Sequence, residues 1–213
     1  MRDFPIYFEL GWQHILDWQG YDHILFVAAL CGIYVFSDWK RILILVTAFT
    51  IGHSITLALS VFNQILIPSN YIEFLIPVTI VTTALTNISR KRNFKRKVNP
   101  VYFMALIFGL IHGLGFSNYL KSLLGKSNNV VAELLAFNVG LEFGQIIIVI
   151  SVLLISFILT QTVRVNKREW NLFLSSAIFG IAIGVLIILI QNRRHPGLEP
   201  TVFAPGREPA DQD

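Results

Sequence analysis

Six long apolar segments, separated by short polar connections, limit the fold of this chain more than any other feature. In the hydrocarbon core of a bilayer every backbone N–H and C=O must be paired within the protein, so segments of this kind form α-helices. A helix needs about 20 residues to cross a bilayer. We therefore predict an all-α polytopic membrane protein with about six transmembrane helices, at about residues 20–36, 42–62, 71–88, 101–120, 130–162 and 170–190.

The remaining residues leave no room for a soluble domain. Hydrophobic residues make up 54% of the chain and charged residues 14%, so residues 1–192 are predicted to form a single transmembrane domain. Pro5 to Trp18 is only partly apolar and rich in aromatic residues, which favours a helix in the membrane interface. The N-terminus lacks the features of a signal peptide. Residues 193–213 are rich in proline and acidic residues and are predicted to be a disordered tail, or a remnant of expression-vector sequence.

The distribution of Lys and Arg predicts the orientation. Cytoplasmic loops of membrane proteins carry an excess of these residues. In this chain they gather at Lys40 and Arg41, in the segment Arg90 to Lys97, and between Arg164 and Arg168. This pattern places both termini outside. The net charge of +4 is therefore interpreted as a topology signal, and we predict no nucleic-acid partner.

The strongly polar side chains of the predicted spans lie between the outer surface and the midplane. Ionisable groups in a membrane are costly, usually face the bundle interior and often mark functional sites. His112 lies near the middle of its span, and Gly109 and Gly113 on either side let neighbouring backbones come close. We predict one divalent-metal site in the outer half of the bilayer, formed by Asp22, His23, His53, His112 and Glu142.

The donor chemistry of this set fits Ni²⁺, Co²⁺ or Zn²⁺, because imidazole and carboxylate groups suit such ions. Cys31 is the one cysteine, which excludes a cysteine-cluster metal site. Asn138, Glu142 and Gln145 are spaced to lie on one stripe of a helix. His14 is expected at the interface rather than at the metal, and His195 is expected to have no role.

Several motifs resemble those of the HupE/UreJ family of bacterial membrane proteins, particularly the branch without a signal peptide. They are the stretches 11–16 (GWQHIL), 20–26 (GYDHILF), 49–57 (FTIGHSITL), 108–116 (FGLIHGLGF) and 137–145 (FNVGLEFGQ). The resemblance implies an accessory protein of hydrogenase or urease operons that carries nickel or cobalt across the bacterial inner membrane. It also implies that Asp22-His23, His53, His112 and Glu142 are the matching motif residues.

Three functions remain open from the residues alone. The first is a metal permease, whose partners are the metal ion and membrane lipids; a homo-oligomer is left open. The second is an intramembrane metal-dependent hydrolase or transferase acting on a lipid or lipidated substrate. In that case Asp22 or Glu142 would be the general base, and Ser54 would position the substrate. The third is a structural protein in which the polar side chains only pair with one another.

Overall fold

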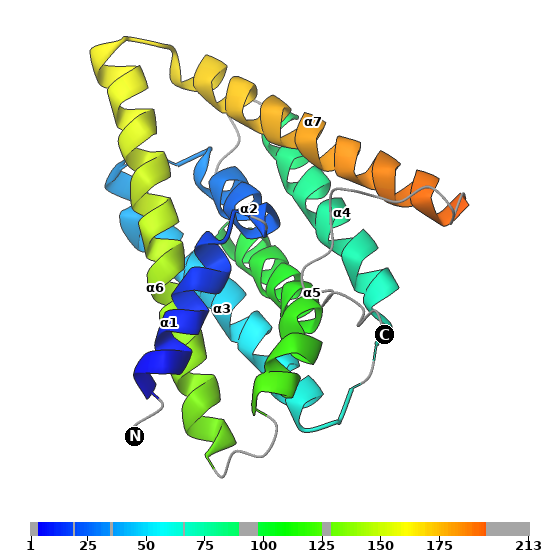
Figure 1. Cartoon of the computed structure of the whole chain (residues 1–213). Helices are drawn as coiled ribbons and strands as arrows, with labels where there is room; N and C mark the ends of the chain where they lie inside the picture. Colours follow the sequence, from blue (N-terminus) through cyan, green and yellow to red (C-terminus); the bar gives the residue numbers. More distant parts are fainter. Residues whose placement is uncertain are drawn as a thin grey trace, which may run out of the picture.

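The computed structural model describes residues 4–18, 20–34, 36–65, 67–89, 98–124 and 129–194, and every regular element in these ranges is a helix (Figure 1). This confirms the predicted all-α fold. The basic segment Arg90 to Lys97, the tail beyond Arg194 and His195 lie outside the described residues. The elements are α1 (Phe4–Leu16), α2 (Tyr21–Cys31), the 3₁₀ turn η1 (Phe36–Asp38), α3 (Trp39–Val61), α4 (Ser69–Ile88), α5 (Val98–Leu124), α6 (Val130–Phe157), the π-helical turn η2 (Ile158–Thr162) and α7 (Lys167–Arg194).

Four stretches of helix in the described chain are long and apolar enough to cross a membrane: α3, α4, the continuous stretch Val130–Thr162 and α7. Two further apolar helical stretches are shorter, namely α2 and Tyr102–Ser117 within α5. The protein is therefore a multi-helix membrane protein. Each of the six segments predicted to span overlaps one of these helices, while the exact number of crossings stays a prediction.

The N-terminal helix α1 packs along α6, and Gly11 and Ile15 are buried there. The interfacial position expected for this helix stays a prediction. A short connection, in which the Gly20 N–H donates to the Asp17 carbonyl at 3.1 Å, separates α1 from α2. The chain then continues into α2, which also contacts α6. Together α1 and α2 form two short consecutive helices that both contact α6.

Two closely packed helix pairs form the centre of the bundle: α1 with α6, and α3 with α5. In each pair, glycines let one backbone touch the other, as small residues commonly do between membrane helices. A Cβ atom added to Gly11 would overlap the Phe137 carbonyl, and one added to Gly52 would overlap the Leu106 carbonyl. The same overlap with a carbonyl would occur at Gly109, Gly113 and Gly140, whereas a Cβ atom at Gly144 would overlap the side chain of Ile15.

The two pairs use equivalent contacts. Phe8 of α1 meets Gly140 of α6 through its carbonyl, just as Phe49 of α3 meets Gly109 of α5. The aromatic rings repeat the pattern: Phe8 lies 5.7 Å from Phe143, and Phe49 lies 5.3 Å from His112. Each pair is parallel, because the contacts advance along both helices together.

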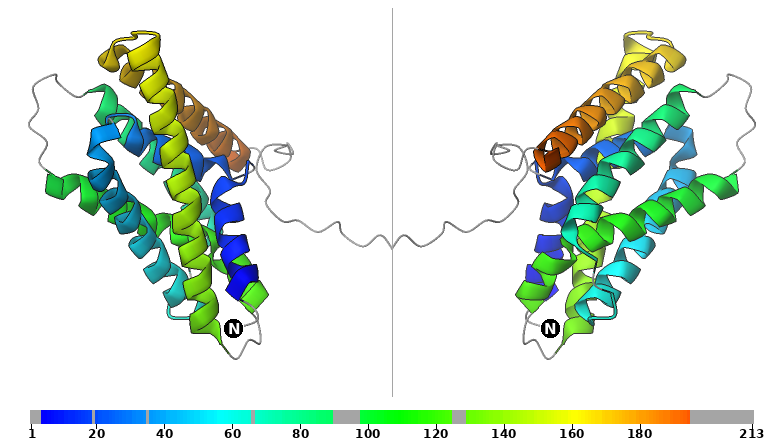
Figure 2. Two further views of the ribbon diagram at one scale, coloured as in Figure 1. Left: turned by 90° about the vertical axis from the view of Figure 1, so that its left-hand side faces the viewer. Right: turned by 90° about the vertical axis from the view of Figure 1, so that its right-hand side faces the viewer.

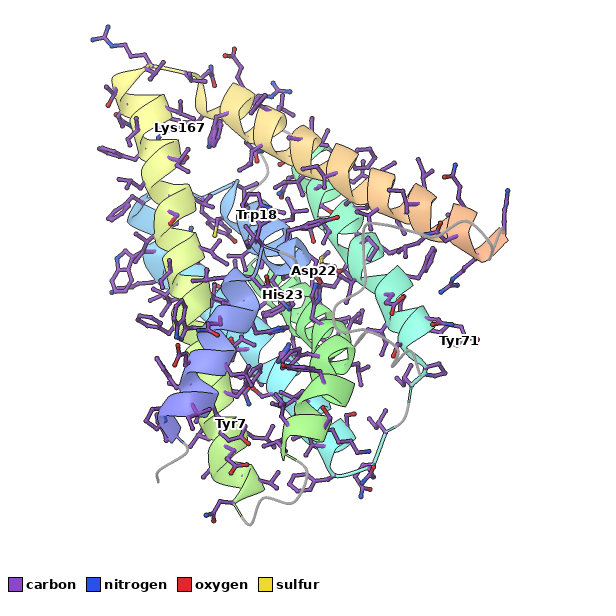
Figure 3. All side chains as sticks on the ribbon, in the orientation of Figure 1. Tyr7, Trp18, Asp22, His23, Tyr71 and Lys167 are labelled. Atoms are coloured by element: carbon purple, nitrogen blue, oxygen red, sulfur yellow. The ribbon has the colours of Figure 1, made fainter. Side chains whose placement is uncertain are left out.

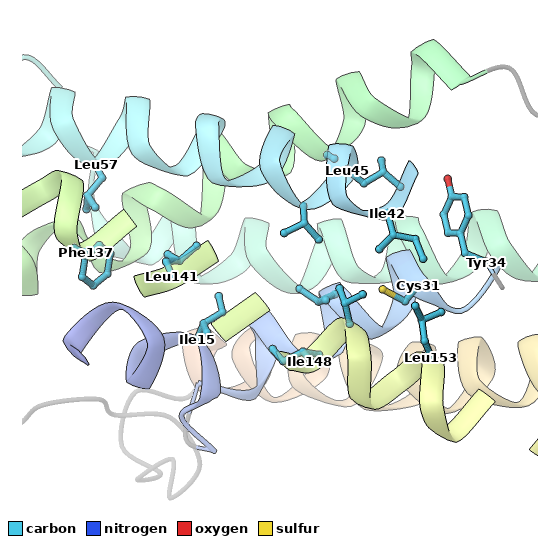
Figure 4. Close-up of a cluster of buried hydrophobic side chains, with 14 of the residues drawn as sticks. Ile15, Cys31, Tyr34, Ile42, Leu45, Leu57, Phe137, Leu141, Ile148 and Leu153 are labelled. Atoms are coloured by element: carbon cyan, nitrogen blue, oxygen red, sulfur yellow. The ribbon is translucent and has the colours of Figure 1, made fainter. Parts of the chain in front are cut away.

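The pairs run in opposite directions, α1 and α6 upward and α3 and α5 downward in Figure 1. Figure 4 shows the same relationship in the core: Leu57 of α3 lies near Phe137 at one end, and Ile42 lies towards Leu153 at the other. Inverted structural units of this kind are found in secondary transporters, where the substrate binds between them.

The outer layer consists of α4 and α7. Figure 2 shows α7 lying obliquely across the bundle beside α4, its main partner. Gly180 and Gly184 of α7 have no atom within 4 Å of an added Cβ, unlike the glycines of the central pairs. The buried side chain of Asn87 in α4 donates to the Ala29 carbonyl of α2 at 2.7 Å, which connects this layer to α2.

Candidate metal centre

Imidazole rings from four helices meet at the centre of the bundle. His14 ends α1, His23 begins α2, and His53 and His112 come from the middle parts of α3 and α5. Ring centroids are 4.7 Å apart for His14 and His23, 6.4 Å for His23 and His53, and 5.3 Å for His23 and His112. Figure 3 places Asp22 and His23 in the middle of the bundle.

Three of these residues are close enough to bind one ion. His14, His23 and His53 each offer a ring nitrogen, and these nitrogens all lie within 4.8 Å of one another. Around a tetrahedral ion with bonds near 2.1 Å the nitrogens would be about 3.4 Å apart. Small side-chain rotations would therefore complete the site.

Most ring nitrogens of this cluster have no hydrogen-bond partner in the described part of the chain. His23, His53 and His112 are at most 5% exposed. Within the described part of the chain, no hydrogen-bond partner meets the buried Nε2 atoms of His14, His23, His53 or His112. A buried polar atom without a partner costs about 1–3 kcal/mol, so such atoms in a native protein indicate a ligand or a functional role.

Two neighbouring groups orient the imidazoles. The Nδ1 atom of His112 lies 2.8 Å from the Phe108 carbonyl, which can only accept a hydrogen bond. Nδ1 must then carry the proton, and Nε2 keeps the lone pair that a metal requires. A carboxylate oxygen of Asp22 lies 3.1 Å from His23 Nδ1 in an ion-pair contact, although its angles are not those of a hydrogen bond. Such a contact holds the ring next to the carboxylate.

Glycine spacing explains how the helices bring these rings together. Gly11 precedes His14 by three residues, and Gly109 precedes His112 by three residues. Residues three apart share a helix face. Each of these histidines therefore lies on the helix face whose glycine contacts the neighbouring backbone. Gly52 directly precedes His53 and lets α3 come close to α5.

Aromatic rings enclose the cluster. Phe116 and Phe137 lie on the His14 side, with the Phe116 ring centroid 3.8 Å from that of His14. Phe26 and Phe49 lie against His112, each at 5.3 Å. An apolar shell of this kind limits the access of water to a metal site.

The predicted set is only partly assembled. His23 and His53 lie in the three-histidine group, and His112 and Asp22 lie beside His23 but outside that group. Glu142 contacts a different residue: its Oε1 accepts a hydrogen bond from Thr47 of α3 at 2.6 Å. The Ser54 hydroxyl donates to the Thr50 carbonyl of its own helix at 2.7 Å, so its proton is already engaged.

His14 is the residue that sequence reasoning missed. It was expected at the interface because its helix is short, partly polar and flanked by tryptophans, yet its ring lies inside the cluster. The available signal was the repeated Gly-x-x-His spacing, which links Gly11-His14 to Gly20-His23 and Gly109-His112.

The comparison with protein families gives one match. The family described as HupE / UreJ protein matches residues 1–191. The chain belongs to the HupE/UreJ family. This family is associated with nickel and cobalt transport, and the match includes every histidine of the cluster. The comparisons with curated proteins and with solved structures yield no match.

Proposed function

We propose that this HupE/UreJ protein is a permease for a divalent transition-metal ion of the nickel and cobalt type. His14, His23 and His53 bind the ion as cargo, Asp22 orients His23, and His112 supplies a neighbouring fourth imidazole. The observation that carries the proposal is the buried group of three ring nitrogens within 4.8 Å of one another. Imidazole is a good ligand for Ni²⁺, Co²⁺ and Zn²⁺.

The arrangement of helices supports transport over a permanently bound ion. His14 and His23 lie on opposite sides of the break between α1 and α2, so two ligands belong to segments that can move relative to each other. The cluster also lies between two helix pairs of opposite direction. Transporters commonly place broken helices and inverted units around a central substrate site.

We further propose that the protein lies in the bacterial inner membrane with both termini outside. The end of the bundle that holds the start of α3 carries Lys40 and Arg41, and the start of α7 carries Lys167. The positive-inside rule assigns these positions to the cytoplasm. His53 lies nearer to Val61 than to Trp39 on α3, which with this orientation supports a site in the outer half of the bilayer.

One observation favours a second candidate, a metal-dependent hydrolase or transferase within the membrane. Three imidazoles leave an open coordination position, as in catalytic zinc sites, and the Asp22 carboxylate lies beside His23. In that case the ion would be a permanent cofactor that activates water.

Liposome uptake separates these functions. Purified protein is reconstituted, and Ni²⁺ or Co²⁺ entry is followed for the wild type, His53→Ala and Gln13→Ala, an exposed control next to His14. The permease predicts uptake by the wild type and by the control, and background entry with His53→Ala. If the wild type instead retains about one metal ion per chain through purification and transports none, the permease is wrong and the enzyme is favoured.

A further inference from the structure

A second polar layer connects α3 and α6 next to the histidine cluster. The Thr47 hydroxyl donates to Glu142 at 2.6 Å, and the Thr50 hydroxyl lies 2.8 Å from Gln145 Oε1. Thr50 is 6% exposed and Gln145 is fully buried. These four side chains all offer oxygen atoms, in contrast to the nitrogen donors of the cluster.

The polar layer lies beside the cluster along the length of α3. Thr50 lies three residues before His53, and Thr47 lies six residues before His53. These separations correspond to about 4.5 and 9 Å along a helix axis. Thr50 therefore shares a helix face with His53, whereas Thr47 shares one with Thr50 and lies about 120° around the helix from His53. The direction from His53 to Thr47 leads towards Trp39 and Lys40, the end that the proposed orientation assigns to the cytoplasm.

Gln145 in this layer has an unsatisfied buried group. The Thr50 hydroxyl has one proton but two acceptors in reach, the Val46 carbonyl at 3.2 Å and Gln145 Oε1 at 2.8 Å. Gln145 Nε2 has no partner among the described residues. The oxygen and nitrogen of an amide are interchangeable by rotation.

If the amide is rotated, Nε2 donates to Thr50 and Thr50 donates to Val46. The Gln145 carbonyl oxygen then becomes the buried atom without a partner. A carbonyl oxygen in this position is an acceptor suited to a cation.

We propose that Glu142 and Gln145, with Thr47 and Thr50, form a second binding step for the same divalent ion on the cytoplasmic side of the histidine cluster. This inference rests on the proposed permease function. Imidazole holds such ions more strongly than neutral oxygen donors do, so an oxygen-lined step would accept the ion and release it. It also explains why Glu142 is present although it is not a member of the three-histidine group.

The test separates binding from transport. Glu142→Gln and Gln145→Leu are compared with the wild type by Co²⁺ titration, followed by visible absorption, and by Co²⁺ uptake into liposomes. We expect both variants to keep the wild-type Co²⁺ affinity and spectrum, because the imidazoles are intact. Uptake should fall to the level of protein-free liposomes with Glu142→Gln and be reduced with Gln145→Leu.

Thr47→Val provides a milder variant, because it removes the hydroxyl that contacts Glu142 and keeps the side-chain shape. Its matched control is Thr82→Val on α4, whose hydroxyl donates to the Val78 carbonyl of its own helix. We expect slower uptake with Thr47→Val and wild-type uptake with Thr82→Val. If the Glu142 variant does not fold, Thr47→Val still tests whether the polar layer lies on the route of the ion.

Three outcomes would overturn the inference. Unchanged uptake in Glu142→Gln or, if that variant does not fold, in Thr47→Val means that the layer is not on the ion's route. An altered Co²⁺ spectrum in Glu142→Gln means that Glu142 is a ligand of the histidine site itself. A wild type that binds Co²⁺ but does not transport it removes the permease function and this inference together, whereas transport without sensitivity to the layer removes the inference alone.

Discussion

The ring of His14 lies 4.7 Å from the ring of His23, across the break that separates α1 from α2. In the proposed permease these two imidazoles would bind the same ion from two consecutive helices. Metal binding would then depend on the relative position of α1 and α2.

The first prediction concerns His14. His14→Ala should weaken Co²⁺ binding as strongly as His53→Ala does, because each substitution removes one of three nitrogen donors. Co²⁺ titration of purified protein measures this effect. Gln13→Ala, which changes an exposed neighbour on the same helix, should bind as the wild type does. Wild-type affinity in His14→Ala would place the ion elsewhere.

Asp22→Asn should weaken metal binding by about 10–100-fold without changing the number of imidazole ligands, as is typical when a group that orients a ligating histidine is lost. The reason is that the Asp22 carboxylate contacts His23 Nδ1 rather than the group of three nitrogens. The same titration gives the affinity, and the visible spectrum of bound Co²⁺ reports the ligands. A change in the spectrum would show that Asp22 binds the ion directly.

Glycine substitutions should have opposite effects in the two layers of the bundle. Gly140→Ala places a methyl group against the Phe8 backbone and should lower the free energy of unfolding by about 1–3 kcal/mol. Gly180→Ala meets no neighbour and should raise it by about 0.5–1 kcal/mol, because alanine is the better helix former. Thermal unfolding in detergent compares the two variants. Equal effects would contradict the close packing of α1 on α6.

Bound metal should stabilise the folded protein by mass action. At a free Co²⁺ concentration of 100 times Kd, the free energy of unfolding should increase by about 2.7 kcal/mol. His53→Ala should show little of this gain at the same concentration, since it lacks one ligand. Unfolding curves recorded with and without Co²⁺ give the difference. A gain of the same size in both proteins would indicate binding at an unrelated site.

The sequence predicted which helices carry the polar residues better than which neighbours those residues meet. Apolar length determines where a residue lies along a span, and this was enough to select His23 and His53 for the site. Apolar length does not show which neighbouring helix each face of a span contacts. Glu142 and Gln145 were correctly placed on one stripe, yet both contact threonines of α3 rather than the imidazoles.

His14 was missed because depth was inferred from hydrophobicity, and the Gly-x-x-His spacing was not used. The helix Phe4–Leu16 has 13 residues and includes Glu9 and Gln13, so it lacks the pattern of a span. Its position depends on contacts between Gly11 and Phe137 and between Gly140 and Phe8, which arise from close backbone packing. Such contacts have no counterpart in composition or periodicity.

X-ray absorption at the metal edge tests the central claim most directly, because it counts the imidazoles around the bound ion. For Ni²⁺ or Co²⁺ bound to the purified protein, the account predicts outer-shell scattering from at least three imidazoles and the loss of one in His14→Ala. Scattering from oxygen ligands alone, or a spectrum that is identical in His14→Ala, would contradict it.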